Sequence, residues 1–307
     1  MAGHLPSQKV EIESILVEDC KDFTRIYDYL VGKLETITTR KGIKKALSRE
    51  QITLNNKLAR SADYVQPGDV IRVHEKELFD VPYFEIDLNV IFEDNELAIV
   101  EKPAGIPVSG NAFKTLQNAL HDRLKISTAI DYLPIPLPVH RLDALTHGIV
   151  IVAKTHSTRV DLGRMFEERK VIKHYVAIVQ GKLGGSGALN TFVDEKSALT
   201  KYQSTATYPS VKNNWISVLK LSPITGRKHQ LRVHLSRLGF PIIGDQLYGK
   251  EGGSLKHKGL FLAAVGISFI HPKTNENLFF EIEVPNKFNR FLEREKRWVE
   301  RVELKKK

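Results

Sequence analysis

The 307-residue sequence predicts an α+β protein, in which a mixed or antiparallel β-sheet forms a large domain behind a small N-terminal α/β domain. Three observations support this prediction. Short apolar runs of strand length mix with segments of helical periodicity, without the strict alternation that marks a doubly wound fold. Apolar residues make up 42% of the chain, which is enough for an ordinary core. The length suits one large domain or two unequal ones, and we place the division between residues 1–80 and 81–307.

In the smaller domain we expect two helices followed by short strands. The first helix is marked by apolar residues at helical spacing: Ile26, Tyr29 and Leu30. Turns at Asn55-Asn56 and Pro67-Gly68 separate the strands that follow. Residues 74–87, with mixed charges and Pro82, are expected to be a linker.

The second expected helix, over residues 40–50, is strongly basic. Its apolar positions would face the core: Ile43, Ala46 and Leu47. Its exposed positions are cationic: Arg40, Lys41, Lys44, Lys45 and Arg49. Residues 36–49 contain no acid that could balance these charges within the segment.

The larger domain is expected to alternate irregularly between strands and helices. Residues 89–94 and 97–103 form a hairpin through Asp94-Asn95-Glu96. The other expected strands lie at residues 149–152, 173–182, 215–226, 259–272 and 278–285. The expected helices lie at residues 115–124, 158–171 and 227–239, the last ending at Gly239, and a further helix with a basic tail closes the chain.

The charge balance points to a polyanionic partner. Lysine and arginine outnumber aspartate and glutamate by 46 to 36, which gives a formal net charge of +10. No run approaches the roughly 18 apolar residues of a membrane-spanning helix, and the N-terminus lacks the apolar core of a secretory signal. Cys20 is the single cysteine, which excludes an internal disulfide and favours the cytoplasm.

Three polar segments, far apart in the sequence, are candidates for a functional site. They are His140-Arg141-Leu142-Asp143, which follows alternating prolines; Lys173-His174-Tyr175, which opens a strand; and residues 225–234, TGRKHQLRVH. The third segment lies within a stretch, Leu219 to Gly244, that holds five basic residues and two histidines but no acid.

One pairing between these segments has a physical basis. A buried Asp143 needs a partner to stay ionised, and Arg232 could bind its carboxylate with both arms of the guanidinium. An ionised aspartate beside the ring of Tyr175 suits nucleophilic or electrostatic work on a flat, stackable substrate such as a nucleobase. The phosphates of such a substrate would meet Arg227, Lys228 and the basic helix.

Each of these features also has an ordinary structural interpretation. The aspartate of an isolated Arg-Leu-Asp is more often a turn residue, a strand tyrosine is usually core, and an arginine-rich helix usually faces water. His140, Asp143 and His147 also have the i, i+3, i+7 spacing of metal ligands along a helix. Prolines before this segment and Gly148 after it argue against a helix, and so against a zinc or iron site there.

In their order along the chain, the polar segments resemble the motifs of the RluA-type pseudouridine synthase family. HRLDALTHGIVIVAK is similar to the motif around that family's catalytic aspartate. FEERKVIKHYVAIVQGK and TGRKHQLRVHLSRLGFPIIGDQLYG resemble its second and third motifs, and EKPAGIPV resembles a turn upstream. These four motifs cover roughly residues 88–285. On the basic helix and the pieces ITLNNK and PGDVIRV, the N-terminal part resembles the S-four-type RNA-binding domain.

The resemblance implies roles for individual residues. Asp143 would be the catalytic aspartate, Tyr175 the base-stacking tyrosine that is also implicated in proton transfer, and Arg232 the partner of the aspartate. Arg141 would help hold a flipped-out nucleotide. In all, substrate contacts are expected from Arg141, His140, Leu231, Arg227, Lys228, Lys44 and Lys45. The sequence departs from the family's pattern around the aspartate, at Ala144, Leu145 and His147.

On this resemblance we expect an isomerase that converts specific uridines in structured RNA, either ribosomal or transfer RNA, to pseudouridine. We expect a cytoplasmic monomer with the pseudouridine synthase fold, which uses no metal or organic cofactor and has no membrane partner. Three roles remain open for the aspartate: addition to the sugar, addition to the base, or removal of a sugar proton. Two other classes also remain open, a non-catalytic RNA-binding protein on the same fold and a metal-dependent hydrolase.

Overall fold

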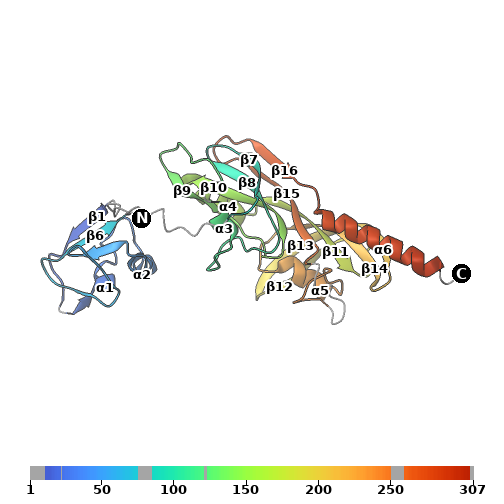
Figure 1. The fold of residues 1–307 in the computed structure, drawn as a ribbon, viewed down its shortest axis with the longest axis horizontal. Helices are drawn as coiled ribbons and strands as arrows, with labels where there is room; N and C mark the ends of the chain where they lie inside the picture. Colours follow the sequence, from blue (N-terminus) through green and yellow to red (C-terminus); the bar gives the residue numbers. More distant parts are fainter. Residues whose placement is uncertain (1–10, 22, 75–84, 121–122, 250–258, 305–307) are drawn as a thin grey trace, which may run out of the picture. The chain divides into compact units, whose positions relative to one another are not determined.

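The computed structural model describes residues 11–21, 23–74, 85–120, 123–249 and 259–304 (Figure 1). The chain divides into two compact units, Met1–Val81 and Pro82–Lys307, and the described residues of each have their own hydrophobic core. Most of the expected linker at residues 74–87 lies outside the described residues. Within the described ranges, no helix combines the length and the apolar character that crossing a membrane requires.

The N-terminal unit contains an antiparallel four-stranded sheet with the strand order β1-β6-β3-β4. These strands are β1 (Glu11–Leu16), β6 (Val70–His74), β3 (Ile52–Leu54) and β4 (Lys57–Leu58). A separate pair joins β2 (Thr24–Arg25) to β5 (Tyr64–Val65). The expected turn at Asn55-Asn56 is confirmed, because both asparagines adopt positive φ between β3 and β4.

Helix α2 (Arg40–Ser48) has the two faces that the sequence predicts. Ile43, Ala46 and Leu47 are buried, and the Thr39 hydroxyl caps the helix by accepting a hydrogen bond from the Gly42 N–H. The expected first helix is only one turn, α1 (Ile26–Tyr29), because the chain turns away at Gly32, which has a φ of +75°. Strand β1 was not predicted.

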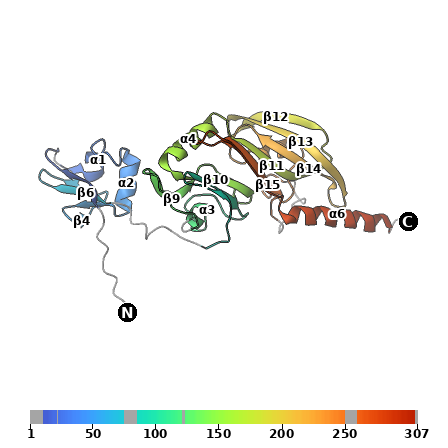
Figure 2. The ribbon, with the colours of Figure 1, turned by 90° about the horizontal axis from the view of Figure 1, so that it is seen from above.

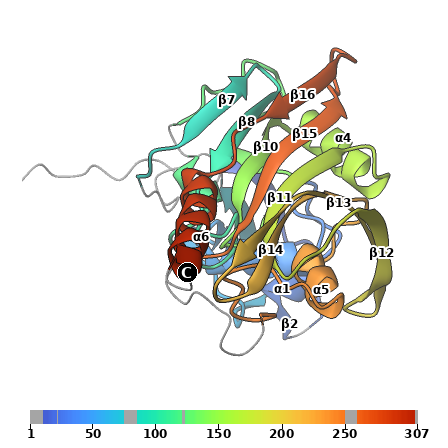
Figure 3. The ribbon, with the colours of Figure 1, turned by 90° about the vertical axis from the view of Figure 1, so that its right-hand side faces the viewer.

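The C-terminal unit contains a mixed ten-stranded sheet, which confirms the predicted α+β class (Figure 3). Its main path runs β12-β13-β14-β11-β15-β10-β8-β7, while β16 pairs with β15 and β9 pairs with β10. In chain order the strands are β7 (Asn89–Glu93), β8 (Leu97–Lys102), β9 (Tyr132–Pro138), β10 (His147–Thr155), β11 (Ile172–Gln180), β12 (Ser186–Val193), β13 (Lys196–Ser210), β14 (Asn214–Pro223), β15 (Leu262–Ile270) and β16 (Asn277–Glu281).

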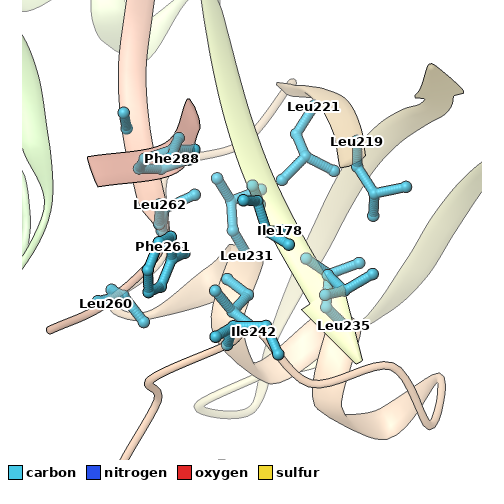
Figure 4. Packing of buried hydrophobic residues seen from close by; sticks show 14 of the residues in the cluster. Ile178, Leu219, Leu221, Leu231, Leu235, Ile242, Leu260, Phe261, Leu262 and Phe288 are labelled. Carbon is cyan, nitrogen blue, oxygen red and sulfur yellow. The ribbon is translucent and has the colours of Figure 1, made fainter. Parts of the chain in front are cut away.

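Four helices pack against this sheet in the described residues: α3 (Leu116–Ala119), α4 (His156–Glu167), α5 (Gln230–Arg237) and α6 (Asn286–Leu304). Helix α4 lies on β9 and β10, and α6 lies along β13 (Figure 2). Leu231 and Leu235 of α5 join Ile178 of β11 and Phe288 of α6 in one buried cluster (Figure 4). This cluster fixes α5 against the sheet, and α5 carries one wall of the site described below.

The sequence missed two features of the sheet. No element was expected at residues 186–210, where β12 and β13 form a long hairpin whose polar and apolar residues alternate weakly. The residues before His140, with their alternating prolines, form strand β9, which tolerates the prolines because it pairs with β10 alone. The helix expected at residues 115–124 is shorter, Leu116–Ala119, and residues 121–122 lie outside the described part.

Candidate active site

A pocket opens in the C-terminal unit where the three polar segments meet. Its volume is about 240 Å³. The loop between β9 and β10 supplies one wall with residues 139–143 and Thr146, β11 supplies Lys173 and Tyr175, and residues 225–232 supply the wall at the start of α5. The structure therefore brings together residues that are far apart in sequence, such as Asp143 and Arg232, which are 89 positions apart.

Asp143 lies in this pocket with its carboxylate partly exposed. Its Oδ2 is 3.5 Å from Nη1 of Arg232, and its Oδ1 is 3.8 Å from Nε2 of His229. The preceding Leu142 is buried in the core, and the Ala144 carbonyl accepts hydrogen bonds from the Gly105 N–H and from Lys102. The loop is thus anchored on both sides of the aspartate, which fixes the direction of its side chain.

Arg232 pairs with Asp143 as predicted, but only through Nη1. The prediction that both arms of its guanidinium bind Asp143 is wrong, because its bidentate partner is Asp245. Nε and Nη2 of Arg232 each donate to a different Asp245 oxygen at 2.8 Å, which leaves Nη1 for Asp143. Burial lowers the pKa of Arg232, but the hydrogen bonds and charge of Asp245, with a contribution from Asp143, outweigh it and raise this pKa above its ordinary value. Arg232 is a fixed cation that Asp245 holds in place beside Asp143.

Tyr175 lies on β11 and lines the pocket together with residues of α5. Burial raises the pKa of Tyr175, and the nearby charge of Asp143 raises it further. Its phenol therefore stays protonated, so the ring can stack and the hydroxyl can donate a hydrogen bond.

Basic and apolar side chains complete the pocket. Arg141 and Lys228 are exposed, while Nε of Arg227 donates to the Ser197 carbonyl at 3.3 Å. Lys173 lines the same pocket two residues before Tyr175 on β11, and burial lowers its pKa. Leu231 is buried and forms part of the pocket's apolar floor.

His140 lies at the pocket wall but is bonded to the fold. Its Nε2 accepts a hydrogen bond from the Ile151 N–H at 3.0 Å, and its ring packs on Phe166 with the centroids 4.8 Å apart. Burial, with a contribution from the Lys173 charge, lowers the pKa of His140 to about 3. His140 is therefore a neutral ring held by β10. It helps to shape the pocket but offers no positive charge that could bind a phosphate.

A metal site at His140, Asp143 and His147 would need these residues on one face of a helix, and the chain is not helical there. Residues 139–146 are irregular, and His147 begins β10 with its Nε2 2.8 Å from Oε1 of Glu101. Among the residues that the structure describes, no three His, Cys, Asp or Glu side chains gather in a group that could hold a metal ion.

Lys44 and Lys45 are not part of this pocket. They lie exposed on α2 in the N-terminal unit, where the Lys44 ammonium is 4.5 Å from the ring centroid of Tyr27. Arg40 also lies over this ring, 5.6 Å from its centroid, so the basic helix carries an aromatic–cationic cluster of its own.

Neither Asp245 nor His229 was predicted individually to have a role in the site. Asp245 was detectable as the first acid after the acid-free stretch that ends at Gly244. His229 stood within the third motif, but nothing local distinguished its side chain from the neighbouring basic residues.

Comparisons with known proteins show which proteins this chain resembles. A family model described as RNA pseudouridylate synthase matches residues 96–237, a range that holds Asp143, Tyr175 and Arg232. An uncharacterized RNA pseudouridine synthase of Aquifex aeolicus is 33% identical over 278 residues, which cover 81% of this chain and 87% of the relative. The dual-specificity RNA pseudouridine synthase RluA of Haemophilus influenzae is 36% identical over 65% of this chain and 94% of its own length.

Another relative aligns with a larger share of this chain, and a further one has a solved structure. The ribosomal large subunit pseudouridine synthase C of Rickettsia bellii is 30% identical over 86% of this chain and 95% of its own length. The structure of human RNA pseudouridylate synthase domain containing 1 shares the fold, with a TM-score of 0.53 at 24% identity over 64% of this chain and 83% of that one. The chain therefore belongs to the RluA-type RNA pseudouridine synthase family and is an isomerase.

Proposed function

We propose that this enzyme converts specific uridines of ribosomal RNA to pseudouridine in the pocket around Asp143, with transfer RNA as the second candidate substrate. The observation that carries the proposal is the meeting of Asp143, Arg232 and Tyr175 in one pocket from three distant segments. Ribosomal RNA is favoured because the relative from Rickettsia bellii, which aligns with most of this chain, is named for the large ribosomal subunit.

The reaction is an isomerisation, so it needs no oxidant, reductant or second substrate. The bond from N1 of uracil to C1′ of the ribose breaks, the base turns, and C5 bonds to C1′ while C5 loses a proton and N1 gains one. A stacked base is inaccessible to the enzyme, so the uridine must be flipped into the pocket, at a cost of a few kcal/mol. Stacking on Tyr175 would offset about 1–3 kcal/mol of that cost.

Asp143 acts as the carboxylate in this scheme. Addition to the sugar, addition to the base and removal of a sugar proton all require its ionised oxygen near C1′. Arg232, which Asp245 holds by two hydrogen bonds, supplies the positive charge that stabilises this oxygen. Arg141, Arg227 and Lys228 surround the pocket and would bind the phosphates next to the flipped nucleotide, while Leu231 would contact the base.

Replacement of Asp143 by Asn tests the catalytic assignment. The amide has nearly the same shape as the carboxylate but no charge, so the variant should fold and bind RNA yet form no pseudouridine. The assay is tritium release from total RNA that is labelled at C5 of uridine and taken from a strain lacking the gene. Asp161→Asn, a matched change on α4 outside the pocket, should retain wild-type activity, and turnover by the Asp143 variant would remove this residue from the mechanism.

A transcriptome-wide map of pseudouridines in strains with and without the gene identifies the substrate. Loss of sites in the large ribosomal subunit is the expected result. Loss confined to transfer RNA would move the assignment to that class. An unchanged map would favour a non-catalytic RNA-binding protein on this fold.

A further inference from the structure

His229 occupies a strained position between Asp143 and Tyr248. It is the residue before α5 and has a φ of +55°, in the left-handed region that residues other than Gly adopt infrequently, Asn, Asp and His more often than the rest. Its Nε2 is 3.8 Å from Oδ1 of Asp143, and its Nδ1 is 3.0 Å from the Tyr248 hydroxyl. The strained backbone thus directs the two ring nitrogens at two different partners.

Tyr248 is held by the same group that holds Arg232. Its backbone N–H donates to Oδ1 of Asp245 at 3.0 Å, and the Arg232 guanidinium lies 5.1 Å from its ring centroid. The rings of His229 and Tyr248 meet edge to face, with the centroids 5.7 Å apart. Asp245 therefore organises two routes to Asp143, one through Arg232 and one through Tyr248 and His229.

The surroundings of His229 favour its neutral form. Burial lowers its pKa, and so do the charges of Arg232 and Lys228, while Asp143 and Asp245 act in the opposite direction; the net result lies below the ordinary value. A neutral imidazole has one donor and one acceptor nitrogen. If the Tyr248 hydroxyl donates to Nδ1, the ring proton must be on Nε2, which faces Asp143.

We propose that His229 is a positioning residue for the reaction: its Nε2–H, fixed in that tautomer by Tyr248, orients the Asp143 carboxylate toward the reacting nucleotide. Arg232 would hold one carboxylate oxygen and His229 the other, so that the carboxylate cannot rotate about its terminal bond. Catalytic hydrogen bonds commonly shorten in the complex with substrate, which makes the 3.8 Å separation compatible with this role. The inference rests on the proposed function of Asp143.

The test uses His229→Asn and Tyr248→Phe, singly and together, in the full-length enzyme. Asn tolerates the left-handed backbone but its short amide cannot replace the ring, so folding and RNA binding should be preserved. Glu195→Asn, at an exposed residue outside the pocket that also has a positive φ, +59°, is the control for the backbone conformation. Single-turnover tritium release from C5-labelled total RNA, with enzyme in excess, gives the maximal rate and the half-saturating enzyme concentration separately.

We expect His229→Asn to lower the maximal rate by about 10- to 100-fold, as misplacement of a catalytic group does. Half-saturation and the melting temperature should stay unchanged. Tyr248→Phe should cause a smaller loss, and the double variant should be no slower than His229→Asn, because Tyr248 acts through His229. If His229→Asn folds poorly, His229→Gly, which also accepts the backbone, takes its place.

Two results would overturn the inference. One is a wild-type maximal rate in a folded His229 variant, and the other is a double variant whose loss is the product of the two single losses. The Asp143→Asn variant is run beside them. If it is inactive while His229→Asn is normal, this inference alone fails, whereas turnover by the Asp143 variant would remove the proposed function itself.

Discussion

At the scale of single residues, Arg232 contacts two carboxylates, the buried Asp245 and the proposed catalytic Asp143. Asp245 is buried and accepts hydrogen bonds from two nitrogens of Arg232 and from the Leu247 and Tyr248 N–H groups. A buried ion pair with this geometry holds its members rigidly, because removing one partner leaves an uncompensated charge. Asp143 has only longer contacts, 3.5 Å from Arg232 and 3.8 Å from His229, and its side chain stays partly exposed.

The low pKa of His140 predicts how the protein's stability changes in acid. In the folded protein the pKa of His140 is about 3, well below its ordinary value of 6.5, so the unfolded chain takes up the proton first as the pH falls. This histidine's contribution to stability is therefore complete above pH 6.5 and is lost between pH 6.5 and about 3, by up to ~1.4 kcal/mol per pH unit.

His140→Gln removes the titrating group but keeps an acceptor for the Ile151 N–H. Urea unfolding of both proteins between pH 7 and pH 4 should show a smaller loss of stability in the variant. Other groups titrate equally in the two proteins, so the difference between the curves isolates His140. Parallel curves would show that this ring does not remain neutral in the fold.

At the scale of elements, the pocket depends on how closely β10 approaches β15. These two strands form the one parallel pair among the strands described, at His147 and Gly148 opposite Ala263 and Ala264. Gly148 has a φ of +135°, and a Cβ there would lie 2.1 Å from the Ala264 carbonyl oxygen. The loop that carries Asp143 runs directly into this contact, so a side chain at position 148 would also displace the pocket wall.

Gly148→Ala should destabilise the C-terminal unit by about 1–3 kcal/mol from backbone strain alone, and by more from the clash. Activity should fall together with stability. Gly163→Ala on α4 is the control, because nothing lies within 4 Å of the added Cβ and alanine is the better helix former. A Gly148 variant as stable as the control would contradict the described approach of the two strands.

At the scale of the whole molecule, the N-terminal unit is the candidate for wider contact with RNA. Reversing the charges of Lys44 and Lys45 to Glu should weaken RNA binding and make its dependence on salt shallower, by about 0.7 in the log–log slope for each lost phosphate contact. Binding of total RNA to the full-length enzyme, measured across a salt series, checks this.

The control for this experiment reverses two exposed lysines outside α2 and the pocket, Lys273 and Lys296. It changes the net charge equally, so a general effect of charge would appear in both double variants. An equal slope in the α2 variant and the wild type would mean that the basic helix does not meet phosphates.

Features that depend on neighbouring residues could be predicted from the sequence alone. The buried and exposed faces of α2, the turn at Asn55-Asn56 and the hairpin of β7 and β8 follow from periodicity and turn chemistry, which act over a few residues. Prediction from the sequence failed for β12 and β13, where the alternation of burial is weak and pairing with neighbouring strands decides the structure.

The partners of the side chains around the pocket could not be predicted in this way, because they depend on contacts between remote segments. The choice of Asp245 over Asp143 for the fork of Arg232, and the place of the His229 ring, depend on where α5 settles against the sheet. That position is set by the burial of Leu231 and Leu235 in the core. Packing of this kind sums many weak contacts between remote segments, so no local pattern in the sequence encodes which of two carboxylates a guanidinium will meet.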